Sequence, residues 1–165
     1  MTARILVAGI GNIFLGDDGF GPEVIRHVGQ GLDGLKDGVP PVDYGIRGMH
    51  LAYDLLEDWR ALVLVDALPD RGAPGTIHVF EADHETLSPT AGLEAHSMDP
   101  AAVFATLRAL GGPPPQTIVI GCEVDTVDEG MGLSAPVSAA VPRAVVAVNE
   151  VLADLATRAT APAEG

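Results

Sequence analysis

Residues 5–23 read ILVAGIGNIFLGDDGFGPE and combine a short apolar run, a glycine-rich turn and the first signals of a helix. The apolar run breaks at Gly9 and Gly11, as a buried strand does where it ends in a tight loop. Gly21 is the predicted N-cap of the helix, and Pro22 suits its first position, where no N–H is needed. The stretch therefore predicts a strand, a loop and a helix in direct succession.

The predicted loop holds two adjacent carboxylates, Asp17 and Asp18. Glycine-rich turns between a strand and a helix commonly cradle a phosphate with backbone N–H groups and the helix N-terminus. Here the third glycine of the G-x-G-x-x-G pattern is missing, and two acids stand where a phosphate would need neutral or positive neighbours. The sequence disfavours nucleotide binding and favours a loop that binds a cation or a donor-rich ligand.

Composition sets the class of the protein. A chain of 165 residues is long enough for one compact core, and 47% hydrophobic content with only 4% aromatic residues requires an aliphatic core, which suits an α/β domain. A net charge of −14 leaves no basic patch for nucleic acid or an anionic membrane. The first apolar run is too short for a signal peptide or a membrane span, so we expect a cytoplasmic protein. The single cysteine, Cys122, restricts any metal site to oxygen and imidazole ligands.

Hydrophobic periodicity predicts the remaining elements. We expect helices over 22–36, 48–57, 100–110 and 137–155, and strands over 42–45, 61–65, 76–80 and 117–122. Residues 66–75 are too few for a parallel crossover, so the strand over 76–80 should be antiparallel to its neighbour. Pro142 should split or kink the last helix. We expect a single α/β domain over 1–158, followed by a mobile tail over 159–165.

Candidate functional groups stand in three loops at the carboxyl ends of predicted strands, where ligands gather in open α/β sheets. Asp17 and Asp18 follow the first strand, Asp66 ends the third, and His96 precedes the helix that leads to the last strand. Two carboxylates within ~5 Å repel by about 3 kcal/mol at an effective dielectric near 20, so converging acids imply a cation, a shared proton or a buried partner. Two carboxylates and an imidazole suit zinc, nickel or another borderline divalent ion.

Each of these residues also has a purely structural interpretation. An aspartate in a glycine-rich turn, such as Asp17, often bonds only its own backbone, and His96 taken alone reads as a surface histidine. The polar residues around His84 read as a solvated cluster. Cys122 lies in an apolar strand and is expected to be a buried hydrophobic residue and not a nucleophile. No G-x-S-x-G elbow is present, so a serine hydrolase of that type is not expected.

At these residues the sequence resembles the nickel-iron hydrogenase maturation endopeptidases. The matching stretches follow the family's order and cover most of the chain: 9–12, 15–21, 43–48, 65–67, the loop around His96, and 130–134. The resemblance implies a three-layer α/β/α sandwich, of a phosphorylase/hydrolase-like kind, whose mostly parallel five-stranded twisted sheet has one antiparallel strand. It also implies a cytoplasmic endopeptidase that removes the C-terminal extension of the hydrogenase large-subunit precursor after nickel insertion.

The resemblance also implies the site residues. Asp18, Asp66 and His96 would contact the metal, and Asp17 would orient them or act as a base. The nickel would arrive with the substrate, with no tightly bound cofactor in the protease itself, and the protein is expected to be a monomer. The segments 45–48 and 68–71 depart from the Gly-Gly-Thr common in the family, which leaves the particular large subunit undecided. Two alternatives stay open: a non-catalytic nickel-sensing module or chaperone, and a nucleotide-binding domain disfavoured by the acids.

Overall fold

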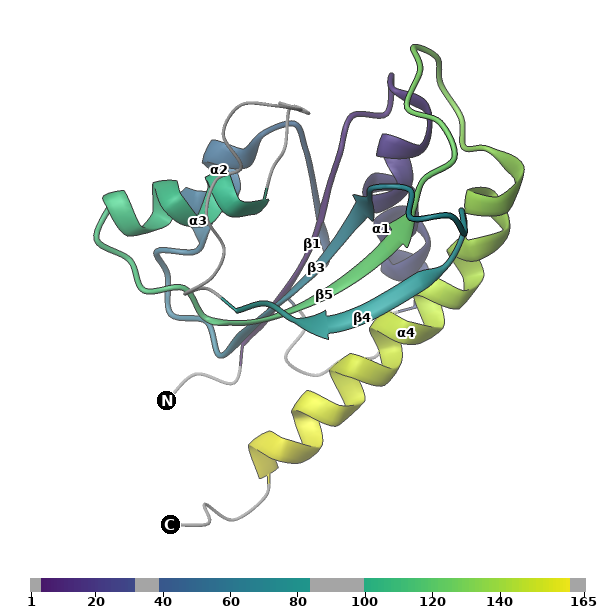
Figure 1. Ribbon diagram of the computed structural model, residues 1–165. Coiled ribbons are helices and arrows are strands. Elements are labelled where there is room, and N and C mark those ends of the chain that lie inside the picture. Colours follow the sequence, from purple (N-terminus) through teal and green to yellow (C-terminus); the bar gives the residue numbers. More distant parts are fainter. Residues whose placement is uncertain (1–3, 32–38, 84–99, 161–165) are drawn as a thin grey trace.

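The computed structural model describes residues 4–31, 39–83 and 100–160 (Figure 1). Five strands form one sheet in the order β2-β1-β3-β5-β4. Their bounds are β1 Ile5–Ile10, β2 Val42–Gly45, β3 Ala61–Leu68, β4 Ile77–Glu81 and β5 Gln116–Glu123. All neighbouring pairs are parallel except β4 with β5, so the antiparallel strand expected from the short connection is confirmed.

Helices cover both faces of the sheet (Figure 1). Their bounds are α1 Phe20–Gly31, α2 Gly48–Asp54, α3 Pro100–Ala109 and α4 Ala135–Thr160. Val63 and Val65 of β3 pack with α1 and α4, whereas Leu62 and Leu64 pack with α2 and α3. This alternation assigns each strand residue to one face, because successive side chains of a strand point to opposite sides. The predicted three-layer α/β/α architecture is therefore confirmed.

The structure moves several predicted boundaries. Helix α1 begins at Phe20, after a 3-10 turn (η1, Gly16–Gly19), and not at the predicted cap Gly21. Helix α2 ends at Asp54, where the indole Nε1–H of Trp59 donates to the Asp54 carbonyl at 2.7 Å. Strand β3 continues two residues beyond Asp66, because residues 66–68 pair with β5.

Helix α4 runs from Ala135 to Thr160 as one helix, so Pro142 does not split it, and the alternative of a kink stays a prediction. A proline inside a helix removes its own hydrogen bond to the carbonyl four residues earlier, here that of Ser138. Ser138 and Pro142 both line an open cavity of about 860 Å3, where water can reach the helix. Helix α4 also includes residues 159 and 160, which the sequence assigned to the tail, and 161–165 lie outside the described residues. Within the described part of the chain, no helix is long and apolar enough to span a membrane.

Gly21 holds the start of α1 directly against the sheet. A Cβ atom at this position would lie 2.4 Å from the carbonyl oxygen of Ile10 and 2.5 Å from that of Val65. Such separations are too short for real atoms, so only glycine permits this approach. The loop that carries Asp17 and Asp18 is thereby placed over the carboxyl ends of β1 and β3.

Replacing Gly21 with alanine should lower the free energy of unfolding by about 2 kcal/mol, because α1 must move away from both strand ends. Urea denaturation followed by circular dichroism measures this. Gly19→Ala is the matched control, because its nearest atom would be the Cα of Ile13 at 3.1 Å, which demands a smaller shift. If both variants lost the same free energy of unfolding, the close contact of Gly21 with the strand ends would not be what excludes a side chain at this position.

Candidate functional site

Asp17 lies in η1 and is completely buried. Its Oδ1 accepts a hydrogen bond from the backbone N–H of Ser134 at 2.7 Å. Its Oδ2 accepts three more, from the Ser134 hydroxyl at 2.7 Å and from the N–H groups of Asp125 at 2.8 Å and Thr126 at 3.0 Å. Asp17 therefore ties the loop after β1 to the loop after β5, and these loops lie side by side in Figure 1.

These bonds determine how Asp17 ionises. Burial raises the pKa of Asp17, but the hydrogen bonds from Ser134, Thr126 and Asp125 outweigh it and leave the pKa below its usual value. A carboxylate that accepts four hydrogen bonds and is hard to protonate is a poor general base. The geometry thus favours an orienting role for Asp17 over the role of base that the sequence left open.

Asp18, the next residue, has far fewer contacts. Its side chain is nearly buried, and its Oδ2 accepts a hydrogen bond from the backbone N–H of Asn12 at 2.8 Å. Within the described residues, no donor is bonded to its Oδ1. Asp18 therefore keeps an oxygen that can bind a cation or a substrate donor.

Asp66 is the second acid at this end of the sheet. It lies near the carboxyl end of β3, is also nearly buried, and pairs in register with Gly121 of β5. It shares the face of Leu62 and Leu64, which is the α2 and α3 face. Asp66 thus lies in β3, and Asp18 lies in η1, the turn that follows the adjacent parallel strand β1.

The third predicted ligand, His96, lies outside the described residues, as does His84. Within the described ranges, no group of three histidine, cysteine or acidic side chains is close enough to hold a metal ion. The two acids fit part of such a site, because both are oxygen donors and within the described residues one oxygen of Asp18 accepts no hydrogen bond. The complete set of Asp18, Asp66 and His96 stays a prediction.

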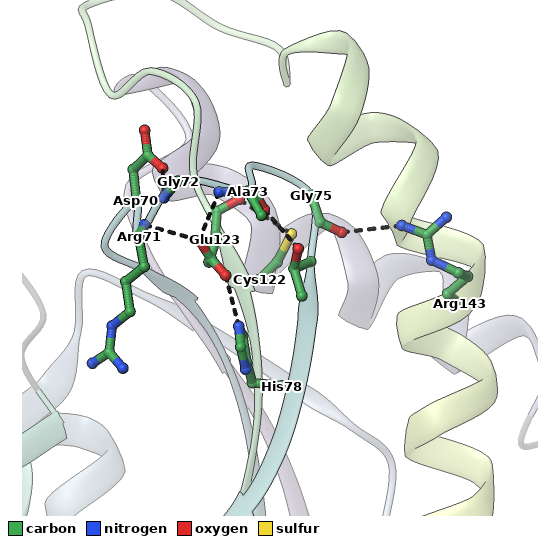
Figure 2. Close-up of polar contacts among 10 residues, drawn as sticks. Asp70, Arg71, Gly72, Ala73, Gly75, His78, Cys122, Glu123 and Arg143 are labelled. Atoms are coloured by element: carbon green, nitrogen blue, oxygen red, sulfur yellow. Dashed lines mark hydrogen bonds and ion pairs between the residues drawn. The ribbon is translucent and has the colours of Figure 1, made fainter.

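A buried glutamate at the end of β5, Glu123, was missed by sequence reasoning. Glu123 ends β5, and its Oε2 lies 2.8 Å from Nε2 of His78 on β4 (Figure 2). Its Oε1 accepts hydrogen bonds from the N–H groups of Arg71 at 2.8 Å and Ala73 at 3.3 Å. The only sequence signal for this pair was the predicted antiparallel strand, because the register of β4 with β5 brings His78 close to Glu123.

Cys122, on the opposite face of β5, is fully buried, as the sequence predicted. Burial, followed by the charge of Asp17, raises the pKa of its thiol to about 11. The thiol therefore stays protonated at neutral pH and cannot act as a thiolate nucleophile.

Known proteins resemble this chain in both sequence and fold. Residues 30–151 match the family described as hydrogenase maturation protease. The hydrogenase expression/formation protein HupD of Rhizobium leguminosarum is 32% identical over 98% of this chain and 80% of its own length. The hydrogenase 2 maturation protease of Escherichia coli is 28% identical over 92% of this chain and 90% of its own length.

Solved structures show the same relationship. The hydrogenase maturating endopeptidase HYBD from E. coli superposes with a TM-score of 0.76 and 28% identity, over 92% of this chain and 93% of its own. The resemblance expected from the sequence motifs is thereby confirmed. Sequence, fold and the acids at the strand ends agree: this chain belongs to the hydrogenase maturation proteases, a family of endopeptidases.

Proposed function

We propose that this protein is a cytoplasmic, monomeric endopeptidase that removes the C-terminal extension from a nickel-iron hydrogenase large-subunit precursor after nickel has been inserted. The observation that carries the proposal is the pair Asp18 and Asp66, two nearly buried carboxylates, one in the turn η1 that follows β1 and the other near the carboxyl end of the adjacent parallel strand β3. A cation would stabilise carboxylates buried at this edge of the sheet, and the precursor would supply it.

The chemistry of the site favours a metal that arrives with the substrate. The proposed ligands are Asp18, Asp66 and His96, which are two carboxylates and one imidazole without a thiolate. Such a set binds borderline metals less tightly than cysteine-rich cages do, and it leaves coordination positions for ligands from another protein. The one thiol, Cys122, is buried on the other face of the sheet. The protease can therefore coordinate a nickel ion that its partner holds, without binding a nickel ion of its own tightly.

Peptide hydrolysis also needs a polarised carbonyl and an activated water molecule. Asp17 is a poor candidate for the base, since its carboxylate already accepts four hydrogen bonds. Activation of the water thus falls to the substrate's metal or to another side chain on the face of Asp66.

We expect cleavage to depend on nickel in the substrate. Matched precursor samples with and without nickel are incubated with the metal-free enzyme, and mass spectrometry follows the loss of the extension. Only the nickel-loaded sample should be shortened, because the acids dock the metal. Excess free divalent cation should slow the reaction by occupying the carboxylates first.

Two outcomes of this experiment would change the proposed function. Equal cleavage of both samples would show that the acids serve ordinary hydrolysis, and nickel sensing would have to be abandoned. Nickel-dependent binding without any loss of mass would favour the non-catalytic alternative, a nickel-sensing module for the large subunit.

A further inference from the structure

His78 lies on the same face of the sheet as Asp66. Asp66 pairs with Gly121 in β5, and Gly121 pairs with His78 in β4, so the three residues form one row across the sheet. Neighbouring strands lie about 4.8 Å apart, which places the Cα of His78 about 10 Å from that of Asp66. Leu68 packs over Gly121 and makes an apolar floor between the two side chains. A peptide bound at Asp66 can therefore extend over this floor to His78.

The imidazole of His78 is held by a buried carboxylate. Its Nε2 lies 2.8 Å from Oε2 of Glu123, which is only 4% exposed (Figure 2). The hydrogen bond from His78, followed by that from the Arg71 N–H, lowers the pKa of Glu123 despite its burial. Glu123 is thus ionised at neutral pH and fixes the ring by accepting from Nε2–H.

This arrangement leaves one ring nitrogen available for proton transfer. With Nε2 bonded to Glu123, Nδ1 can exchange a proton, and the side chain is 41% exposed. An imidazole oriented by a carboxylate is the usual form of a general base. The other charged groups nearby are Asp66 across β5 and Arg71 and Asp70 on the loop after β3. Glu81, on His78's own strand, alternates to the other face and binds Gln116.

We propose that His78, oriented by Glu123, carries the proton during peptide hydrolysis at this site, an inference that rests on the proposed endopeptidase function. Nδ1 takes a proton from the attacking water as the water oxygen bonds to the scissile carbonyl carbon. The same proton then passes to the leaving nitrogen as the C–N bond breaks. The ring returns to its neutral form, and no electron is gained or lost.

A purely structural role for this pair can be separated from proton transfer. Glu123 holds the loop after β3 through Oε1, which binds the N–H groups of Arg71 and Ala73 independently of His78. His78→Gln keeps a side-chain donor for Oε2 but cannot shuttle a proton. The loop should stay in place in this variant while catalysis is lost.

The test compares His78→Gln with wild type on nickel-loaded precursor. We expect kcat to fall by about 10²–10⁴-fold with KM and the melting temperature unchanged, because a positioned acid–base group contributes that much. His27→Gln is the matched control, since His27 is 40% exposed and lies 3.0 Å from Glu23 on α1, and it should keep wild-type kcat.

The outcomes separate this inference from the proposed function. An active wild type with an equally active His78→Gln variant would overturn the role of His78 and leave the protease assignment standing. A raised KM with unchanged kcat would also overturn it, by showing that His78 only helps to bind substrate. A wild type that never shortens the nickel-loaded precursor would overturn both.

Discussion

Replacing Asp17 with alanine should lower the free energy of unfolding by about 4 kcal/mol, the largest stability loss expected of any acid in the described loops. Three backbone N–H groups and one hydroxyl lose their acceptor at a position that water does not reach. Each buried donor left unsatisfied costs about 1–3 kcal/mol, reduced here by local rearrangement. For a chain of this size the melting temperature should fall by roughly 8–16 °C.

Urea denaturation and thermal melting measure the effect of Asp17→Ala. Asp70→Ala is the control, since that exposed carboxylate accepts a single local hydrogen bond from the Gly72 N–H at 2.7 Å. Its loss should stay within about 0.5 kcal/mol. If Asp17→Ala were as stable as Asp70→Ala, Asp17 would not be the anchor between the two loops.

The same bonds predict acid lability. The pKa of Asp17 is lower in the folded protein than in the unfolded chain, where it is about 3.9. Its contribution to stability is therefore complete above pH 4 and is lost as the pH falls through the folded pKa. Asp17→Asn should be less stable at neutral pH and should show a flatter fall in stability below pH 4.

Asp18→Ala and Asp66→Ala should each reduce processing of nickel-loaded precursor by at least about a hundredfold while the protein stays folded. Each variant removes a proposed contact to the substrate's metal. Asp18 accepts only one hydrogen bond from the described residues, so its removal should cost little stability. His96→Ala should have the same effect if the residue joins the site as the family resemblance implies.

A processing assay run beside far-UV circular dichroism separates lost chemistry from lost structure. Asp128→Ala is the matched control, because Asp128 is an exposed acid on the loop that packs against η1, and it should process precursor normally. Normal processing by either Asp18→Ala or Asp66→Ala would remove that residue from the site. Loss of the folded signal in these variants would show that the acid has a structural role.

Much of the fold was accessible from sequence because it depends on local rules. Helical spacing after Pro22, the nearly continuous apolar strand after Arg60 and the short connection before Thr76 each constrain the chain within a few residues. That is enough to predict an α/β sheet with one antiparallel strand, as observed. The boundaries that the structure places elsewhere, such as the start of α1 and the end of β3, depend on contacts with strands distant in sequence.

The candidate site also has a part that the sequence predicted and a part that only the tertiary structure determines. Sequence marked Asp17, Asp18 and Asp66 as acids at strand ends, and only the family resemblance separated a metal contact at Asp18 from an orienting or basic role for Asp17. Only the tertiary structure surrounds Asp17 with donors from the loop after β5, while among the described residues one oxygen of Asp18 has no donor. It also joins His78 to Glu123, which are separated by 45 positions. A residue's type is local information, whereas its ionisation and partners depend on which distant groups the fold brings within about 3 Å.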